Sequence, residues 1–389
     1  MIATTAATIR TKIAALKKDS GSHSPSIATM LREIPELKIK VDACFLSNPY
    51  ATEHFINHLQ TDLIDNHKIR EVLEFYPPQN SDVAASIAAV NGVAKECIFV
   101  GNGAIEVIQA VIHRFAGSKL SLPLPTFSSY YEYATEDHEV AYFPLQKEEG
   151  YKININDYLE FIEKEGVDTA ILINPNNPNG WYASQSELRH FIGSLQHLKM
   201  VIIDESFVHF AYENDTLEPV SIEPWIAEFP NLVVIKSMSK DFGIAGLRAG
   251  YGVMSAARVS ALLANGYLWN ISGLTDYFFK LYSTPAFREE YEVHRVRYIK
   301  DTVSFLKALE EIEGIRAYPS KANFGLIEIQ NGLSSSDFSM NMLCKYGVYV
   351  RDCSDKIGLE GAFVRIAARS AAENKLIVEA IKGSLSPAE

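Results

Sequence analysis

The sequence predicts an α/β protein with a mostly parallel sheet that carries helices on both faces. Short apolar runs typical of buried strands alternate with helical stretches from residue 98 to residue 240. After Gly252 the pattern changes to helices, then strands, then a closing helix, which indicates a second and smaller α+β domain. A chain of 389 residues is also too long for one ordinary hydrophobic core, so two domains are expected.

Local patterns predict the individual elements. In the large domain, strands begin at Ile98 and cover residues 120–124, 169–173, 201–205 and 232–235, and helices cover residues 52–63, 83–90, 157–165 and 184–195. Ser184 is a suitable N-cap for the last of these helices. In the small domain, helices are expected over residues 274–279, 287–312 and 371–381, and strands over residues 324–329, 348–351 and 363–368. We therefore predict an N-terminal arm (1–48), a large domain (49–275) and a small C-terminal domain (276–389).

Composition narrows the function classes. A net charge of −12 disfavours a nucleic-acid partner, because phosphate binding needs a basic face. No apolar run is long enough to span a bilayer, so no membrane partner is expected. The four cysteines lie far apart without a CxxC pair, which is typical of reduced thiols in a cytoplasmic protein.

Two features near the N-terminus allow more than one interpretation. Residues 1–18 contain four basic residues and no acid, and we expect an amphipathic helix or arm there, although a transit peptide has a similar composition. His54 and His58 are four residues apart, as metal ligands can be on a helix. The position after His54 holds Phe55 instead of the glutamate that a zinc-protease helix requires, so we expect packed or surface histidines and no metal.

Several polar residues follow the predicted strands of the large domain. Gly101, Asn177, Asp204 and Lys240 all fall at or just after a strand end, where parallel sheets bind their ligands. Gly101 and Gly103 lead from a strand into a helix, a turn that can bind phosphate with backbone N–H groups. An amine, a carboxylate, an asparagine and a phosphate-binding turn together fit pyridoxal 5′-phosphate (PLP), whose aldehyde forms a Schiff base with a lysine.

Five motifs resemble one family. They are Gly101-Asn102-Gly103-Ala104, the run 174–180 (NPNNPNG), Asp204-Glu205-Ser206-Phe207, Ser237-Met238-Ser239-Lys240 followed by Gly246-Leu247-Arg248, and Val364-Arg365-Ile366. In this order and spacing the chain resembles the class I/II aminotransferases of PLP fold type I, in the histidinol-phosphate aminotransferase-like branch, from about residue 48 to residue 381. The resemblance implies an α/β fold of that type.

The resemblance also assigns roles to residues. Lys240 forms the Schiff base and moves the proton at the substrate α-carbon, and Asp204 pairs with the ring nitrogen. Further cofactor contacts are implied for Gly103, Ala104, Ile105, Phe127, Asn177, Phe207, Ser237, Ser239, Arg248 and, from the other subunit of a homodimer, Tyr76. Arg365 is implied to bind the substrate α-carboxylate, a role that suits its planar fork, and Arg351, Asn48 and Tyr50 are implied to complete the substrate site.

The expected reaction is transfer of an amino group between an amino acid or phosphorylated amine and a 2-oxo acid. Phe207 departs from this expectation, because most of the family has a tyrosine at that position. Phe207 and the stretch 351–354 (RDCS) resemble the threonine-phosphate decarboxylases, so decarboxylation of an O-phospho amino acid is the alternative. The two reactions differ in which α-carbon bond stands perpendicular to the ring, which a sequence does not report. A third alternative is a non-catalytic PLP-binding protein, which Lys240, Asp204 and Arg365 together disfavour.

Overall fold

We describe a computed structural model of the chain over residues 2–264 and 266–385. The chain forms two compact units. The larger unit comprises Ser47–Asn177 and Trp181–Ile299, and the smaller unit comprises the chain up to Leu46, the short segment Pro178–Gly180 and the chain from Lys300 onward. The domain limits expected at residues 48 and 275 stay a prediction.

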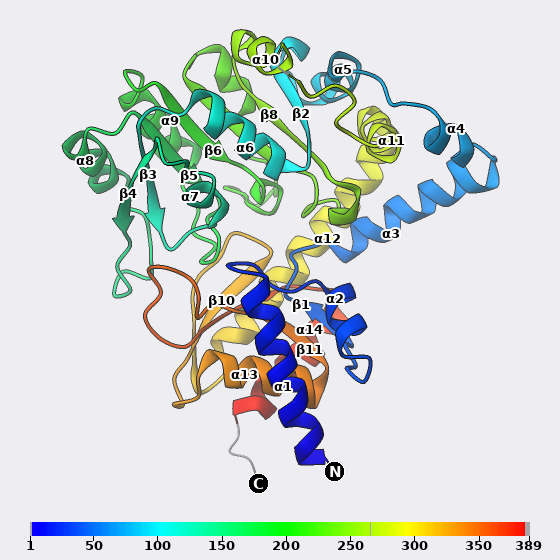
Figure 1. Ribbon diagram of the computed structural model, residues 1–389, viewed down its shortest axis with the longest axis vertical. Helices are drawn as coiled ribbons and strands as arrows, with labels where there is room; N and C mark the ends of the chain where they lie inside the picture. Colours follow the sequence, from blue (N-terminus) through cyan, green and yellow to red (C-terminus); the bar gives the residue numbers. More distant parts are fainter. Residues whose placement is uncertain (1, 265, 386–389) are drawn as a thin grey trace. The chain divides into compact units, whose positions relative to one another are not determined.

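The larger unit is built on a seven-stranded sheet with the order β2-β8-β7-β6-β5-β3-β4 (Figure 1). The strands are β2 (Ile98–Asn102), β3 (Lys119–Leu124), β4 (Glu139–Pro144), β5 (Thr169–Ile173), β6 (Met200–Asp204), β7 (Leu232–Ser237) and β8 (Ala249–Val253). All neighbouring pairs are parallel except the two that β8 makes, with β2 and with β7. The predicted mostly parallel sheet is therefore confirmed. The sequence analysis missed β8, because its glycines are unfavourable in a strand.

Helices flank this sheet, as predicted. They are α3 (Pro49–His58), α4 (Ile69–Glu74), α5 (Asn80–Asn91), α6 (Ala104–Phe115), α7 (Ser129–Glu132), α8 (Ile155–Glu165), α9 (Gln185–Ser194), α10 (Ala256–Leu263), α11 (Gly273–Ser283) and the first part of α12 (Pro285–Glu310). Ser184 caps α9 in a capping box with Glu187, each side chain bonding to the other's backbone N–H. The apolar face of α6, including Val107 and Val111, packs into the core formed by β3, β5, β6 and β7.

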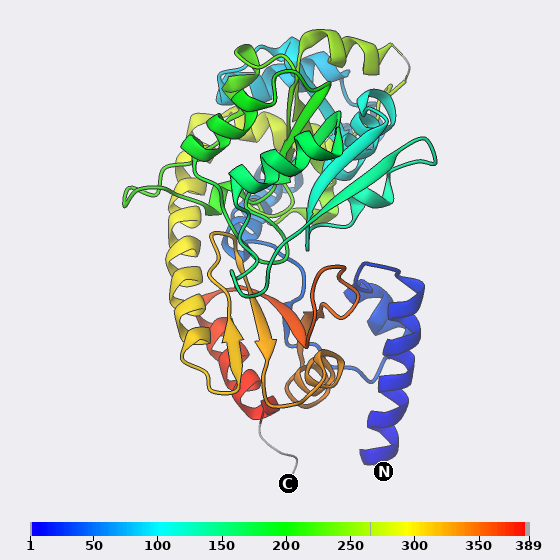
Figure 2. The same cartoon turned by 90° about the vertical axis from the view of Figure 1, so that its left-hand side faces the viewer.

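The smaller unit contains a five-stranded sheet with the order β1-β11-β12-β10-β9. Its strands are β1 (Val41–Ala43), β9 (Ile315–Ala317), β10 (Phe324–Ile329), β11 (Val348–Asp352) and β12 (Phe363–Ala367), and its helices are α1 (Ile2–Asp19), α2 (Ile27–Glu33), α13 (Ser335–Asn341), α14 (Ala371–Leu385) and the end of α12. Figure 2 shows α1 in dark blue beside the orange elements of this unit. Lys17 of α1 forms a 2.7 Å ion pair with Asp352 at the end of β11, so the predicted arm is helical and bound to this unit.

None of the helices within residues 2–264 and 266–385 is both long enough and apolar enough to cross a membrane.

Candidate functional site

The predicted polar residues lie at one edge of the seven-stranded sheet. Strands β2, β3, β5, β6 and β7 run in the same direction, so their carboxyl ends share this edge. Asp204 ends β6, and Lys240 follows β7 by three residues. Asn177 lies four residues after the end of β5, and Phe127 lies three residues after the end of β3. The structure thus brings together, on the larger unit, the residues that the sequence motifs placed at separate strand ends.

Asp204 is buried and held by two hydrogen bonds. Its Oδ2 accepts from the Tyr130 hydroxyl at 2.7 Å, and its Oδ1 accepts from the Ser206 backbone N–H at 2.8 Å. Burial raises the pKa of this carboxyl above its usual range, while the bonds from Ser206 and Tyr130 act in the opposite direction. A protonated ring nitrogen beside Asp204 would supply the positive charge that favours its ionised form. Sequence reasoning missed Tyr130, although it lies in the run that follows β3.

A buried lysine, Lys236, holds the loop that carries Lys240. Lys236 Nζ lies 2.9 Å from Asp241 Oδ2, and His209 Nδ1 lies 2.8 Å from the same oxygen. Burial alone would raise the pKa of Asp241, but the Lys236 ammonium and His209 hold it below its usual range. Asp241 directly follows Lys240, so this buried cluster fixes the backbone at the lysine. The Lys240 carbonyl also accepts a 2.9 Å hydrogen bond from the Asn48 backbone N–H.

The turn between β2 and α6 forms a close-packed cradle. Gly103 has φ +78°, a backbone conformation that strongly favours glycine, and a Cβ there would lie 2.3 Å from Arg248 Nη2. A Cβ at Gly250 would lie 2.4 Å from the Ala104 backbone nitrogen. No side chain caps the N-terminus of α6 among the described residues, which leaves the N–H groups of Ala104 and Ile105 for an anion.

Arg248 brings a cation to the same turn. Its Nη1 donates to the Ala245 carbonyl at 3.1 Å, and its Nη2 donates to the Asn102 carbonyl at 3.4 Å. Ser237 and Ser239 are buried at the end of β7. A cation, backbone N–H groups and hydroxyls next to a lysine and a buried carboxylate fit the phosphate, aldehyde and ring nitrogen of PLP.

The remaining predicted residues of the larger unit lie in different settings. Phe207 is buried, whereas Tyr76 is 80% exposed and packs against Trp269 with ring centroids 4.9 Å apart. Tyr50 lies beneath the Arg297 guanidinium, whose Cζ is 4.1 Å from the ring centroid. Asn48 is fully buried and caps α3 through Oδ1, and its Nδ2 finds no acceptor within the described part of the chain.

The two predicted substrate arginines face each other on neighbouring strands of the smaller unit. Arg351 of β11 pairs in register with Arg365 of β12. Arg365 Nη2 donates to the Cys44 carbonyl at 2.9 Å, and Arg351 Nη2 lies 2.7 Å from Asp355 Oδ2. Lys356 lies five residues after Arg351, in a turn where its backbone N–H donates to the Cys353 carbonyl at 3.0 Å. Burial and then the charge of Arg351 lower its pKa to about 8. We call Arg351, Lys356 and Arg365 the basic cluster; sequence reasoning missed Lys356, which no motif contains.

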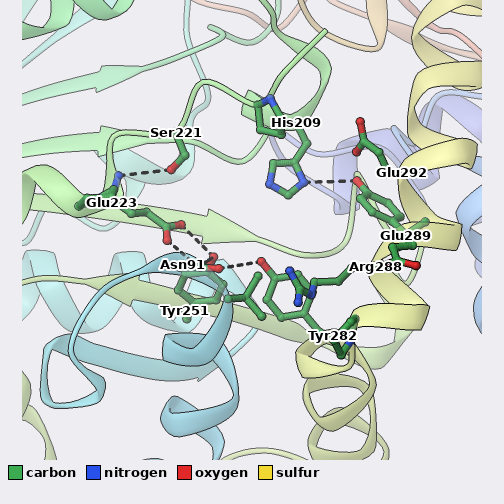
Figure 3. A pocket seen from close by; sticks show the side chains of 14 residues that line it. Asn91, His209, Ser221, Glu223, Tyr251, Tyr282, Arg288, Glu289 and Glu292 are labelled. Carbon is green, nitrogen blue, oxygen red and sulfur yellow. Dashed lines mark hydrogen bonds between the residues drawn. The ribbon is translucent and has the colours of Figure 1, made fainter. Parts of the chain in front are cut away.

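A further cavity of about 660 Å³ in the larger unit is lined by a network of acids and tyrosines (Figure 3). Asn91 Nδ2 donates to Glu223 Oε2 at 2.6 Å, and the Tyr251 hydroxyl donates to Glu223 Oε1 at 2.8 Å. Ser221 also lines this cavity, and its hydroxyl donates to Glu205 Oε2 at 2.5 Å. Burial, and then the charge of Glu223, raise the pKa of Glu205 to about 8.

The family follows from a comparison with known proteins. The family model for aminotransferase class I and II matches residues 46–381. The chain belongs to this family. It is an enzyme of the PLP-dependent class, and its fold matches PLP fold type I, as the sequence motifs implied.

Individual relatives correct the expected reaction. An L-serine phosphate decarboxylase of Campylobacter jejuni is 52% identical over 373 residues, which are 96% of each chain. An L-serine phosphate decarboxylase of Sulfurospirillum multivorans is 43% identical over 371 residues, 95% of each chain. The solved structure of a decarboxylase from Sulfurospirillum multivorans has a TM-score of 0.94 and 41% identity, covering all of both chains.

The prediction of an aminotransferase was therefore wrong, and a 2-oxo acid co-substrate has no support. The error has a physical reason. The resemblance implies the same lysine, the same carboxylate and the same phosphate-binding turn for both reactions, and these are the parts that the motifs contain. Which bond of the α-carbon breaks depends on how the substrate is oriented, and only Phe207 and the stretch 351–354 favoured decarboxylation.

Proposed function

We propose that this enzyme is a PLP-dependent decarboxylase of O-phospho-L-serine. The reaction would break the bond between the α-carbon and the carboxylate, release CO₂ and leave O-phosphoethanolamine. The observation that carries this proposal is the identity of 52% and 43%, over 95% or more of the chain, to two L-serine phosphate decarboxylases.

The basic cluster supports a substrate with two anionic groups. O-Phosphoserine carries a carboxylate and a phosphate, and desolvated anions need cations and hydrogen-bond donors. We assign Arg365 to the carboxylate, as the family motif implies, and Arg351 and Lys356 to the phosphate. A pKa of about 8 keeps Lys356 largely protonated at neutral pH, and a bound phosphate would raise this pKa further.

On the larger unit, each residue has a separate task. When bound, PLP draws electrons from the breaking bond at the α-carbon. The Asp204 carboxylate holds the proton on the ring nitrogen, and Tyr130 keeps that carboxylate in place. Lys240 Nζ delivers the proton that replaces the lost carboxylate at the α-carbon. Asn48 Nδ2 is a buried donor that can bind a substrate oxygen.

We also propose that the enzyme is a homodimer. Tyr76 is assigned to the cofactor phosphate of a partner subunit, and its large exposed fraction is compatible with such a role. Sedimentation analysis of the purified protein tests whether it forms a dimer, and a monomer would contradict the assignment of Tyr76.

The substrate is tested with the PLP-loaded enzyme and three candidates. O-Phospho-L-serine, O-phospho-L-threonine and histidinol phosphate are each incubated with and without 2-oxoglutarate, and CO₂, amine product and glutamate are measured. We expect CO₂ and O-phosphoethanolamine from O-phospho-L-serine without any keto acid. Glutamate formed only when 2-oxoglutarate is present would refute the proposal.

A further inference from the structure

Two histidines and a glutamate meet where α3 contacts the first part of α12, within the larger unit (Figure 1). His54 Nδ1 lies 3.4 Å from Glu290 Oε2, and His58 Nε2 lies 3.6 Å from the same oxygen. One ligand atom from each of the three residues lies within 4.8 Å of the others. We propose that His54, His58 and Glu290 form a binding site for a divalent transition-metal ion such as Zn²⁺.

The two nitrogen–oxygen distances of the cluster suit a tetrahedral ion. Zinc binds histidine nitrogen and carboxylate oxygen at about 2.0–2.2 Å, so two ligand atoms of a tetrahedral site lie about 3.3–3.6 Å apart. The two nitrogen–oxygen distances of this cluster already have these values. Two histidines and one glutamate are also a known zinc ligand set that leaves one position open.

The outer ring nitrogen of His54 has a partner that orients its imidazole. His54 Nε2 lies 3.2 Å from the Phe287 carbonyl oxygen, so this nitrogen carries the proton and Nδ1 presents its lone pair to Glu290. His58 Nδ1 lies 3.7 Å from Asp62 Oδ2, which is longer than a hydrogen bond. Metal-binding histidines typically have a carbonyl or carboxylate at the second nitrogen, because it fixes the tautomer and the ring orientation.

Packing holds the His54 ring in place. His54 is buried, with its ring stacked on Phe287 at a centroid distance of 4.5 Å. His294 lies one helical turn after Glu290, and its ring centroid is 5.3 Å from that of His54.

The site would fasten α3 to α12. The N-cap of α3 is Asn48, whose backbone N–H donates to the Lys240 carbonyl. A metal ion at the other end of α3 would therefore stabilise an element that contacts the catalytic lysine. This reverses the expectation from the sequence, which weighed the two histidines without Glu290, far along the chain.

Zinc binding by tag-free protein tests the proposal. After chelator treatment and removal of free PLP, Zn²⁺ is titrated in competition with a chromophoric chelator. We expect one Zn²⁺ per chain, and a Kd weakened at least about 10-fold in His58→Ala and Glu290→Gln, as loss of an outer partner alone already causes such a change. Zn²⁺ should also raise the Tm of the wild type but not of these variants.

Two variants serve as controls. His197→Ala removes a surface histidine that pairs with Glu163 at 3.0 Å, and Glu289→Gln changes the exposed neighbour of Glu290. Both should bind Zn²⁺ as the wild type does. The Glu290 side chain is 59% exposed, so its replacement leaves the core intact and a weaker Kd cannot be explained by misfolding. Fewer than one Zn²⁺ per wild-type chain, or equal affinity in His58→Ala and Glu290→Gln, would overturn the proposal.

Discussion

Two regions of this enzyme differ in what they indicate about its function. One is the carboxyl edge of the seven-stranded sheet, and the other is the basic cluster of the smaller unit. The sheet edge holds Lys240, Asp204 and the turn at Gly103, which we assign to the cofactor that the family has in common. The basic cluster holds Arg351, Lys356 and Arg365, which we assign to the anionic groups of the substrate. The cofactor class can therefore be read from the first region, whereas the substrate depends on the second.

The largest expected effect comes from the sheet edge. Lys240→Ala should lower kcat by more than about 10³-fold with every substrate, because it removes both the amine that binds PLP and the proton donor. The visible absorbance of the bound cofactor should change as well. Lys164→Ala, which alters an exposed lysine of α8, is the matched control and should keep both. If Lys240→Ala retained turnover, the assignment of the sheet edge as the catalytic region would fail.

The basic cluster should give a smaller and more selective effect. Arg365→Ala should lower kcat/KM for O-phospho-L-serine by about 30–1000-fold, since an unpaired desolvated carboxylate costs about 2–4 kcal/mol. The affinity for PLP should stay within about twofold of the wild type. Steady-state kinetics and a PLP titration measure the two quantities, and Arg316→Ala, at an exposed arginine of β9, is the control. Equal losses of PLP affinity and kcat/KM would show that the two regions are not separable in this way.

The smallest expected effect is on the stability of the folded chain, and it comes from Glu205, which we assign to neither the cofactor nor the substrate. The pKa of Glu205 is raised to about 8 in the folded chain from its usual value of 4.5. The folded state therefore binds more protons than the unfolded state between these pH values, and stability is lost as the pH rises through about 8. Glu205→Gln removes this titration and keeps an acceptor for the Ile222 N–H. We expect the free energy of unfolding of the variant, relative to that of the wild type, to rise by about 1–3 kcal/mol when the pH is raised from 5 to 9.

Urea unfolding at several pH values measures this gain. Glu160→Gln, at an exposed position of α8, should show no pH-dependent difference from the wild type. A constant difference between Glu205→Gln and the wild type would mean that Glu205 is ionised across the whole range.

The sequence predicted the sheet edge because its residues lie beside apolar strands and in recognisable turns. Asp204 and Lys240 could be placed from the runs that precede them. Tyr130 and Glu290 could not, because their partners Asp204 and His54 lie elsewhere along the chain and meet them only in the folded protein. Lys356 was missed although it lies five residues after Arg351, because no motif contains it. The antiparallel strand β8 was missed for a local reason, since its two glycines have a low propensity for strands.

The fate of the α-carbon bond tests the central claim most directly. When the PLP-loaded enzyme converts O-phospho-L-serine in D₂O, the carboxylate should be replaced by one solvent-derived hydrogen. We predict O-phosphoethanolamine with a single deuterium on the carbon that bore the carboxylate, in equal amount to the CO₂ released, as measured by NMR and mass spectrometry. A keto product without CO₂ would contradict the account.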